Sequence, residues 1–340
     1  MSYRIAINGY GRIGRCIVRA FYESNDYLDL KIVAINDIAD TKTLAHLTQY
    51  DSTHGRFLGS VAEVGNALVI NKDVIKVSNK HELHELPWRE LNIDMVMECS
   101  GTFTARSQAE QYLEKGIKKV LFSQPAESDV DATLVYGINH QSMDKNAKII
   151  SNASCTTNCI VPVLKALDDC FVIDKGVITI IHSAMNDQPV IDSYHHNDLR
   201  KTRSAMQSII PVETGLAKGI ERIMPHLAGA LEAQAIRVPT VNVSAIDLTV
   251  SVSKSTDVDS VNQAMREVSQ SLLPNVMGVT EEPLASCDFN HDPRSAIVDL
   301  SQTRVAGVRL IKLLVWFDNE WAYANRMLDV ARFISDKADD

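Results

Sequence analysis

The stretch that decides the fold reads Arg4-Ile5-Ala6-Ile7-Asn8-Gly9-Tyr10-Gly11-Arg12-Ile13-Gly14. Its first residues form a short apolar run typical of a buried strand, and a helical pattern follows from Arg15 to Tyr22. Gly9, Gly11 and Gly14 lie between the two, where glycines let the backbone approach a pyrophosphate at the N-terminus of a helix. Strand, glycine loop and helix together predict a dinucleotide-binding domain.

A second predicted strand, Lys31 to Ile35, ends at Asn36-Asp37. An acid about 20 residues beyond the glycine loop accepts hydrogen bonds from the ribose 2′-hydroxyl of a dinucleotide. The same carboxylate would repel a 2′-phosphate, so Asp37 favours NAD over NADP. The alternative is that Asp37 only caps a loop, as short acidic side chains often do.

Strands and a helix continue to alternate along the first half of the chain. The expected elements are a hairpin of Ala67 to Ile70 with Val74 to Val77, strands over 94–98 and 119–122, and a helix over 105–115. This alternation predicts a mostly parallel sheet, whose ligands bind beyond the carboxyl ends of the strands. Ser100-Gly101-Thr102 and Ser123-Gln124-Pro125 follow two such strands, so Ser123 is expected at the cofactor.

A cysteine motif follows at Ser151-Asn152-Ala153-Ser154-Cys155-Thr156-Thr157-Asn158-Cys159. It lies between an apolar run, Ala147 to Ile150, and a helical pattern, Ile160 to Leu167, so Cys155 is predicted where a strand turns into a helix. The amides and dipole of a first helical turn favour thiolate over thiol, which makes Cys155 a candidate nucleophile that meets the cofactor. Cys159 runs into apolar residues and is expected in the core. No Cys/His spacing predicts a metal site.

The second half of the chain has a different pattern. Long strands are predicted over 177–181, 243–253 and 309–317, with an amphipathic helix carrying Val261, Ala264, Val268 and Leu272 between the last two. We therefore predict an α/β protein: an N-terminal Rossmann-type doubly wound sheet and an α+β catalytic domain with a mostly antiparallel sheet. The expected domains are 1–154 and 155–318, and a C-terminal helix over 319–336 is expected to pack back on the first.

His182 is the natural partner for Cys155, because it ends a predicted strand and begins a polar segment. An imidazole beside a thiol stabilises the thiolate and can later act as a general base. Basic or hydroxyl-bearing residues that can hold a phosphate lie at Arg200-Lys201-Thr202-Arg203, at Thr214-Gly215 and at Arg237. The alternative for the first of these is a solvated charged surface.

Composition limits the possible functions. The 340 residues are 45% hydrophobic and 23% charged, with a formal net charge of −9 and six cysteines. The acidic balance argues against a nucleic-acid surface, and the cysteines form no disulfide pattern. Neither a secretory signal nor a membrane-spanning run is visible, so we expect a cytoplasmic protein without a membrane partner.

The sequence resembles the glyceraldehyde-3-phosphate dehydrogenase family over nearly its whole length. The resemblance rests on the glycine loop, the cysteine motif, Arg237-Val238-Pro239-Thr240 and Trp316-Phe317-Asp318-Asn319-Glu320-Trp321. It implies that a Cys155 thiolate attacks an aldehyde, that hydride passes to NAD and that a thioester remains to be cleaved. Homotetramers are usual in the family.

The resemblance also implies roles for individual residues. His182 would activate the thiol and the later nucleophile, Asn319 would orient the nicotinamide amide, and the Cys155 amide would stabilise an oxyanion. Arg12 and Ile13 would contact the cofactor phosphates. The implied phosphate ligands of the substrate are Ser154, Thr156, Thr214, Gly215 and Arg237, with either Arg200 or Lys201.

Within this family, the segment from His182 to Arg203 is most similar to the erythrose-4-phosphate dehydrogenase branch. Met185 occupies the position where phosphorylating members usually carry a phosphate-binding threonine. This implies oxidation of the phosphorylated aldose D-erythrose 4-phosphate to 4-phosphoerythronate, deacylation by water and a place in pyridoxal 5′-phosphate (pyridoxine) biosynthesis. The alternatives are a phosphorylating glyceraldehyde-3-phosphate dehydrogenase and a non-catalytic NAD-binding regulatory protein.

Overall fold

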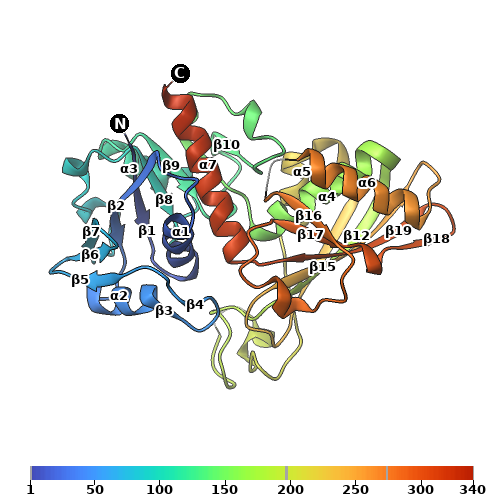
Figure 1. Ribbon diagram of the computed structural model, residues 1–340, viewed down its shortest axis with the longest axis horizontal. Coiled ribbons are helices and arrows are strands. Elements are labelled where there is room, and N and C mark those ends of the chain that lie inside the picture. Colours follow the sequence, from blue (N-terminus) through green and yellow to red (C-terminus); the bar gives the residue numbers. More distant parts are fainter. Residues whose placement is uncertain (1, 196–197, 273–274, 340) are drawn as a thin grey trace. The chain divides into compact units, whose positions relative to one another are not determined.

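The computed structural model describes residues 2–195, 198–272 and 275–339, and it divides into two compact units (Figure 1). Unit 1 comprises Met1–Ser154 and Tyr323–Asp340, and unit 2 comprises Cys155–Ala322. The chain therefore passes from one unit to the other immediately before Cys155 and returns inside its last helix.

Unit 1 contains strands and helices that alternate along most of its sequence. Its strands are β1 (Tyr3–Asn8), β2 (Leu30–Asn36), β3 (Tyr50–Asp51), β4 (Gly55–Arg56), β5 (Val61–Glu63), β6 (Ala67–Ile70), β7 (Asp73–Ser78), β8 (Met95–Glu98), β9 (Lys119–Phe122), β10 (Ala132–Thr133) and β11 (Ile149–Ser151). Its helices are α1 (Arg12–Glu23), α2 (Thr41–Gln49), α3 (Arg106–Glu114) and most of α7 (Trp321–Asp339), with 3₁₀ turns η1 (Leu83–Glu85), η2 (Arg89–Leu91) and η3 (His140–Ser142).

The main sheet of unit 1 has nine strands in the order β10-β11-β9-β8-β1-β2-β7-β6-β5. Every pairing from β10 to β7 is parallel. The last two pairings, β7 with β6 and β6 with β5, are antiparallel. The predicted doubly wound parallel sheet is thus confirmed, and so is the predicted hairpin of β6 and β7.

Unit 2 has a second sheet. Its strands are β12 (Ile173–His182), β13 (Ile210–Val212), β14 (Leu231–Arg237), β15 (Ser244–Val252), β16 (Met277–Thr280), β17 (Ala296–Asp299), β18 (Arg304–Ala306) and β19 (Leu310–Phe317). Its helices are α4 (Cys155–Phe171), α5 (Leu216–Ile223) and α6 (Val258–Ser271), with 3₁₀ turns η4 (Leu199–Thr202), η5 (Pro225–Leu227), η6 (Ser286–Phe289) and η7 (Leu300–Gln302).

The strand order of this sheet is β13-β14-β12-β15-β19-β17-β16, and β18 pairs with β19. Two pairings, β12 with β14 and β16 with β17, are parallel and the other pairings are antiparallel. The mostly antiparallel sheet is therefore confirmed. Leu248, Val250 and Val252 share the buried face of β15, as their alternation predicted.

The glycine loop packs too tightly for side chains at two positions. Gly9 has a φ of +88°, and a Cβ there would lie 2.4 Å from the Cα of Ser100. A Cβ on Gly14 would lie 2.3 Å from the carbonyl oxygen of Gly9. Only glycine therefore fits at these two positions. Helix α1 begins at Arg12, three residues before the predicted start.

Helix α4 also begins earlier than its apolar pattern predicted. The pattern starts at Ile160, but the helix starts at Cys155 and includes the polar residues of the motif. Cys159 is fully buried, which confirms its expected place in the core.

Among the described residues, no helix combines the length and the apolar character needed to cross a bilayer.

A buried polar network joins the carboxyl ends of three strands in unit 1. Glu98, at the end of β8, is fully buried and accepts hydrogen bonds from Asn8 Nδ2 at 2.8 Å and from the Tyr112 hydroxyl. Asn8 Oδ1 in turn accepts from Asn36 Nδ2 at 2.8 Å. The Ser100 amide donates to the other oxygen of Glu98 at 2.8 Å. One carboxylate thus ties β1, β8 and α3 to the loop that faces Gly9.

Replacing Glu98 with alanine is expected to lower the free energy of unfolding by about 3 kcal/mol, because several buried donors would lose their acceptor. The measurement is urea denaturation followed by far-UV circular dichroism. Glu110→Ala, which removes an exposed ion pair of α3, serves as the control and should change stability by less than about 0.5 kcal/mol. Equal stability of the two variants would show that the network contributes little.

Candidate active site

The glycine loop and Asp37 lie together at the carboxyl ends of β1 and β2. The Tyr10 amide donates to Asp37 Oδ2 at 2.7 Å, and the Ala39 amide donates to Oδ1 at 3.0 Å. These bonds hold the carboxylate beside the loop. A Cβ on Gly11, at the N-cap of α1, would meet nothing within 4 Å, so this part of the loop is open to a ligand. The open space at Gly11, the amides at the start of α1 and the fixed carboxylate of Asp37 can together hold a dinucleotide.

The Arg12 side chain is paired with an acidic residue. Both terminal nitrogens of Arg12 bind the carboxylate of Asp51, which is itself almost fully buried. Burial alone would raise the pKa of Asp51, but the Arg12 guanidinium and the amides of His54 and Thr53 outweigh it and lower that pKa. Arg12 therefore helps to fix the segment after α2. Contact between a cofactor phosphate and Arg12 or Ile13 stays a prediction.

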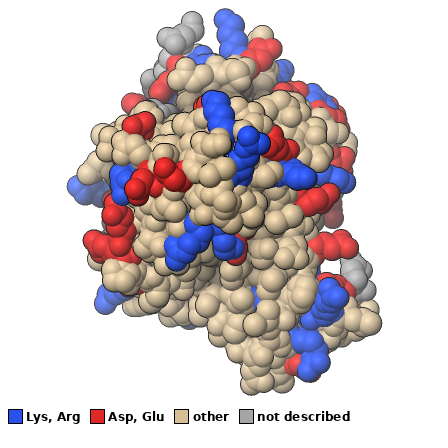
Figure 2. All heavy atoms as spheres, turned by 90° about the vertical axis from the view of Figure 1, so that its right-hand side faces the viewer, with Lys and Arg blue, Asp and Glu red and all other residues tan. Residues whose placement is uncertain are grey.

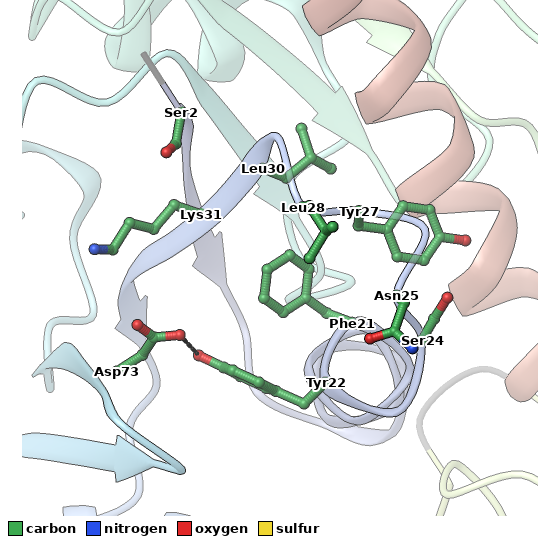
Figure 3. A pocket seen from close by; sticks show the side chains of 10 residues that line it. All are labelled: Ser2, Phe21, Tyr22, Ser24, Asn25, Tyr27, Leu28, Leu30, Lys31 and Asp73. Atoms are coloured by element: carbon green, nitrogen blue, oxygen red, sulfur yellow. Dashed lines mark hydrogen bonds between the residues drawn. The ribbon is translucent and has the colours of Figure 1, made fainter.

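Other loops of unit 1 follow the carboxyl ends of its strands, as predicted. Ser123 comes directly after β9, and its amide donates to the carbonyl of Glu98 at 2.9 Å, which sets it beside the end of β8. An open pocket, by contrast, lies at the amino ends of the strands (Figure 3). Ser2, Leu30 and Asp73 line it from the starts of β1, β2 and β7. That edge is opposite to the one where ligands of parallel sheets bind.

Cys155 is the first residue of α4, at the strand-to-helix junction that the sequence predicted. Burial raises the pKa of its thiol to about 11. The amides of Thr156 and Cys155 and the positive charge of Arg237 lower that pKa, but by less than burial raises it. The expected helix-terminus effect is thus present and is outweighed by burial. Cys155 is a thiol that needs a base.

His182 ends β12 and has the properties of that base. Its Nδ1 lies 2.8 Å from the carbonyl oxygen of Ser183, so Nδ1 carries the donated proton and Nε2 is the acceptor atom. Burial lowers the pKa of His182, which favours the neutral ring. The charges of Arg237 and Glu320 act on the pKa values of both Cys155 and His182. Both groups therefore lie in one electrostatic environment.

Asn319 is held by two serine hydroxyls within unit 2. Its Oδ1 accepts from Ser183 Oγ at 3.0 Å and from Ser244 Oγ at 2.8 Å. These bonds assign the oxygen of the amide and turn its Nδ2 away from the two serines. Asn319 thus presents an oriented donor next to the end of β12. Its role toward a nicotinamide stays a prediction.

Two of the predicted phosphate ligands meet at one carboxylate. Arg237 Nη1 donates to Asp187 Oδ1 at 2.6 Å, and Lys201 Nζ donates to Asp187 Oδ2 at 3.0 Å. Arg200 is exposed on η4, and its amide donates to Asp198 Oδ1. Of the two alternatives, Lys201 is the one that the structure brings beside Arg237.

The remaining predicted ligands lie at helix starts. Thr214 Oγ1 accepts from the Leu216 amide at 3.2 Å, and Gly215 is the N-cap of α5. Thr156 is buried in the first turn of α4, whereas Ser154 is half-buried at the last position of unit 1.

The face shown in Figure 2 carries basic and acidic side chains interspersed rather than one extended basic surface.

Sequence reasoning missed the residues that hold the reactive groups in place. Ser183, Asp187 and Gln188 lie in the segment from His182 to Arg203 but received no role from the sequence, and Ser244 was not singled out. Asp187 and Arg237 are 50 positions apart, so no local spacing signals their contact. The pairing of β12 with β14, which sets His182 opposite Arg237, is what brings them together.

Comparison with known protein families agrees with this arrangement. Residues 3–106 match the glyceraldehyde 3-phosphate dehydrogenase NAD binding domain, and residues 154–319 match the C-terminal domain of the same family. The first match covers the glycine loop and Asp37, so unit 1 contains an NAD-binding domain. The second covers Cys155, His182, Arg237 and Asn319. With both domains present, the chain belongs to the glyceraldehyde-3-phosphate dehydrogenase family.

Proposed function

We propose that this chain is an NAD-dependent dehydrogenase that oxidises D-erythrose 4-phosphate to 4-phosphoerythronate and releases the product with water. The observation that carries the choice within the family is Met185. Its thioether cannot donate a hydrogen bond, so it cannot replace the hydroxyl that phosphorylating members usually have at this position. The residue is 46% exposed, and its backbone amide donates to Gln188 Oε1 at 3.2 Å. A bound inorganic phosphate would therefore lack one donor.

The first step is the activation of Cys155. A thiol with a pKa near 11 is almost entirely protonated at neutral pH, so the attack on an aldehyde requires removal of its proton. Neutral His182 accepts that proton at Nε2, because Nδ1 already donates to the Ser183 carbonyl. The sulfur then bonds to the aldehyde carbon, and the Cys155 amide at the start of α4 stabilises the developing oxyanion.

The thiohemiacetal on Cys155 is then oxidised and hydrolysed. NAD, when bound, supplies the hydride acceptor for this oxidation. His182 returns the thiol proton to the oxyanion, takes it back from the hydroxyl as the thioester forms, and releases it to solvent. As a neutral base again, His182 then removes a proton from a water molecule. The water oxygen bonds to the acyl carbon, the bond to sulfur breaks, and His182 returns its proton to the Cys155 sulfur as the acid leaves.

A phosphate group on the substrate matches the basic pair of Arg237 and Lys201. Arg237 is 9% exposed, and Lys201 and Arg237 bind different oxygens of the Asp187 carboxylate. A phosphorylated aldose of four carbons would use these cations to position its aldehyde at Cys155. A phosphorylating reaction on glyceraldehyde 3-phosphate is the second candidate, because the same cations could bind inorganic phosphate.

The deciding experiment measures NADH formation with erythrose 4-phosphate and with glyceraldehyde 3-phosphate, each with and without inorganic phosphate. We expect a higher kcat/KM for the four-carbon sugar and no effect of phosphate. Strict dependence on phosphate with the three-carbon sugar would establish the second candidate.

Cys155→Ala should abolish turnover and retain NAD binding. Turnover that survives in this variant would remove Cys155 from the mechanism.

The raised pKa of Cys155 predicts the pH dependence of its alkylation. In the cofactor-free protein, the rate with iodoacetamide should rise about tenfold per pH unit from pH 7 to pH 9, because only the thiolate reacts. Mass spectrometry of the Cys155 peptide separates this site from exposed Cys287. If the alkylation rate of Cys155 instead stopped increasing with pH at about pH 6, the thiolate and a protonated His182 would form a stable pair.

Asp37 is predicted to decide between NAD and NADP. Asp37→Asn keeps an oxygen that can accept from the Tyr10 amide but removes the negative charge, so repulsion of a 2′-phosphate disappears. The ratio of kcat/KM for NAD to that for NADP should fall about tenfold or more, which corresponds to roughly 1.4 kcal/mol. Asp40→Asn, at the N-cap of α2, is the control and should leave the ratio unchanged. An unaltered ratio in Asp37→Asn would exclude Asp37 as the ribose ligand.

A further inference from the structure

The turn that leads into Cys155 has a strained backbone. Ala153 has a φ of +53°, which lies in the left-handed region that residues other than glycine rarely adopt. The residue is 3% exposed, so this conformation belongs to the packed interior. Strain of this kind persists only where the surrounding structure enforces it, and it is found most often at functional sites. Helix α4 begins two residues later, at Cys155.

Hydrogen bonds within unit 1 hold the amide side of this turn. The Asn152 amide donates to the carbonyl of Phe122, at the end of β9, at 3.0 Å. The Ala153 amide donates to Ser151 Oγ at 3.1 Å, and that hydroxyl donates to the Gln124 carbonyl at 2.7 Å. These bonds fix the turn up to the amide of Ala153, and its carbonyl needs a separate partner.

Helix α7 supplies the partner for the carbonyl side. The Tyr323 hydroxyl donates to the carbonyl oxygen of Ala153 at 2.9 Å and lies 3.5 Å from that of Asn152. Tyr323 is buried, and α7 is itself anchored in unit 1, where Asp329 accepts from the Tyr27 hydroxyl at 3.0 Å. The direction of the Ala153 carbonyl sets the direction in which the chain leaves the turn.

The bond joins the two places where the chain passes between the units. Ser154 is the last residue of the N-terminal part of unit 1, and Tyr323 is the first residue of its C-terminal part. Because only Ser154 lies between Ala153 and Cys155, a rotation of the Ala153 carbonyl passes directly to the first residue of α4. The tyrosine hydroxyl is therefore placed to control where this helix starts.

We propose that Tyr323 is a positioning residue, whose hydroxyl keeps Ala153 in the left-handed conformation and thereby sets the place of the Cys155 sulfur at the start of α4. This inference rests on the proposed function, which makes Cys155 the nucleophile. Without the hydroxyl, Ala153 relaxes toward the extended conformation that alanine prefers, and the first turn of α4 frays. Fraying exposes the Cys155 thiol to water and moves it away from the position of attack.

The test compares the unaltered full-length protein with Tyr323→Phe, which removes only the hydroxyl. In the cofactor-free protein at pH 8, alkylation of Cys155 by iodoacetamide should become about fivefold faster or more, because burial is what suppresses the thiolate. The kcat for the better of the two sugar phosphates should fall about tenfold, because a displaced nucleophile reacts slowly. The KM for NAD should change by less than about twofold, since the glycine loop is untouched.

Two controls separate this effect from a general loss of structure. Tyr27→Phe removes a buried hydroxyl that anchors the same helix through Asp329, and it should leave both rates within about twofold of the unaltered protein. Cys159, fully buried one turn further along α4, should stay unlabelled in Tyr323→Phe, as tandem mass spectrometry can show. An equal effect of Tyr27→Phe, or labelling of Cys159 as fast as Cys155, would overturn the inference.

Ala153→Gly supplies a second, independent variant. Glycine adopts the left-handed conformation without strain, so the turn depends less on the hydroxyl. Within an Ala153→Gly background, Tyr323→Phe should therefore change the alkylation rate by less than about twofold. An effect as large as in the alanine background would show that Tyr323 acts elsewhere, and an unchanged alkylation rate in the single Tyr323→Phe variant would also overturn the inference. Because alkylation needs neither NAD nor a sugar phosphate, this result is independent of which aldehyde is the substrate.

Discussion

The chemistry of this chain depends on the backbone amides at the start of a helix that directly follows a parallel strand. The first turn of a helix has N–H groups with no acceptor inside the helix, and they point at whatever lies before it. This arrangement occurs where β1 leads into α1 through the glycine loop and where β11 leads into α4 at Cys155. The first arrangement suits the phosphates of a dinucleotide, and the second places a thiol and an oxyanion site at one point.

Burial works against the second arrangement. The amides at the start of α4 stabilise a thiolate, yet the loss of water around Cys155 destabilises it more, and the pKa of the thiol rises. The same burial lowers the pKa of His182 and keeps its ring neutral. The two opposite shifts have one consequence: a protonated thiol and an unprotonated base coexist at neutral pH. In the proposed mechanism, the nucleophile is therefore formed only when the proton moves from Cys155 to His182.

Basic side chains of both candidate binding regions are paired with carboxylates. Arg12 binds Asp51 beside the glycine loop, and Arg237 and Lys201 bind Asp187 in unit 2. A partly buried cation without a counter-ion would be costly, so each is held by a carboxylate that also fixes its direction. Asn319 is held in the same manner by the hydroxyls of Ser183 and Ser244. Groups that bind or react thus rest on residues whose own role is to orient them.

The sequence by itself determined the main features of both units. Periodicity and glycine spacing located β1, β2, β9 and the hairpin of β6 and β7, and the cysteine motif predicted the strand-to-helix turn at Cys155. These signals are local, because a strand, a tight turn or a helix start depends on neighbouring residues. The start of α1 was less well placed, because this helix begins within the glycine loop, where the apolar period is not yet visible. The start of α4 was located by the cysteine motif, although its apolar period begins only at Ile160.

Only the tertiary structure decided how the charged groups are paired. Arg12 binds Asp51 and Lys201 lies beside Arg237, because folding brings together residues that are far apart in sequence. The pKa of Cys155 was decided in the same way, since the helix start is a local feature but the burial that outweighs it comes from the surrounding fold. Short-range spacing specifies which groups a chain offers, whereas long-range packing sets their distances, their exposure to water and therefore their charge.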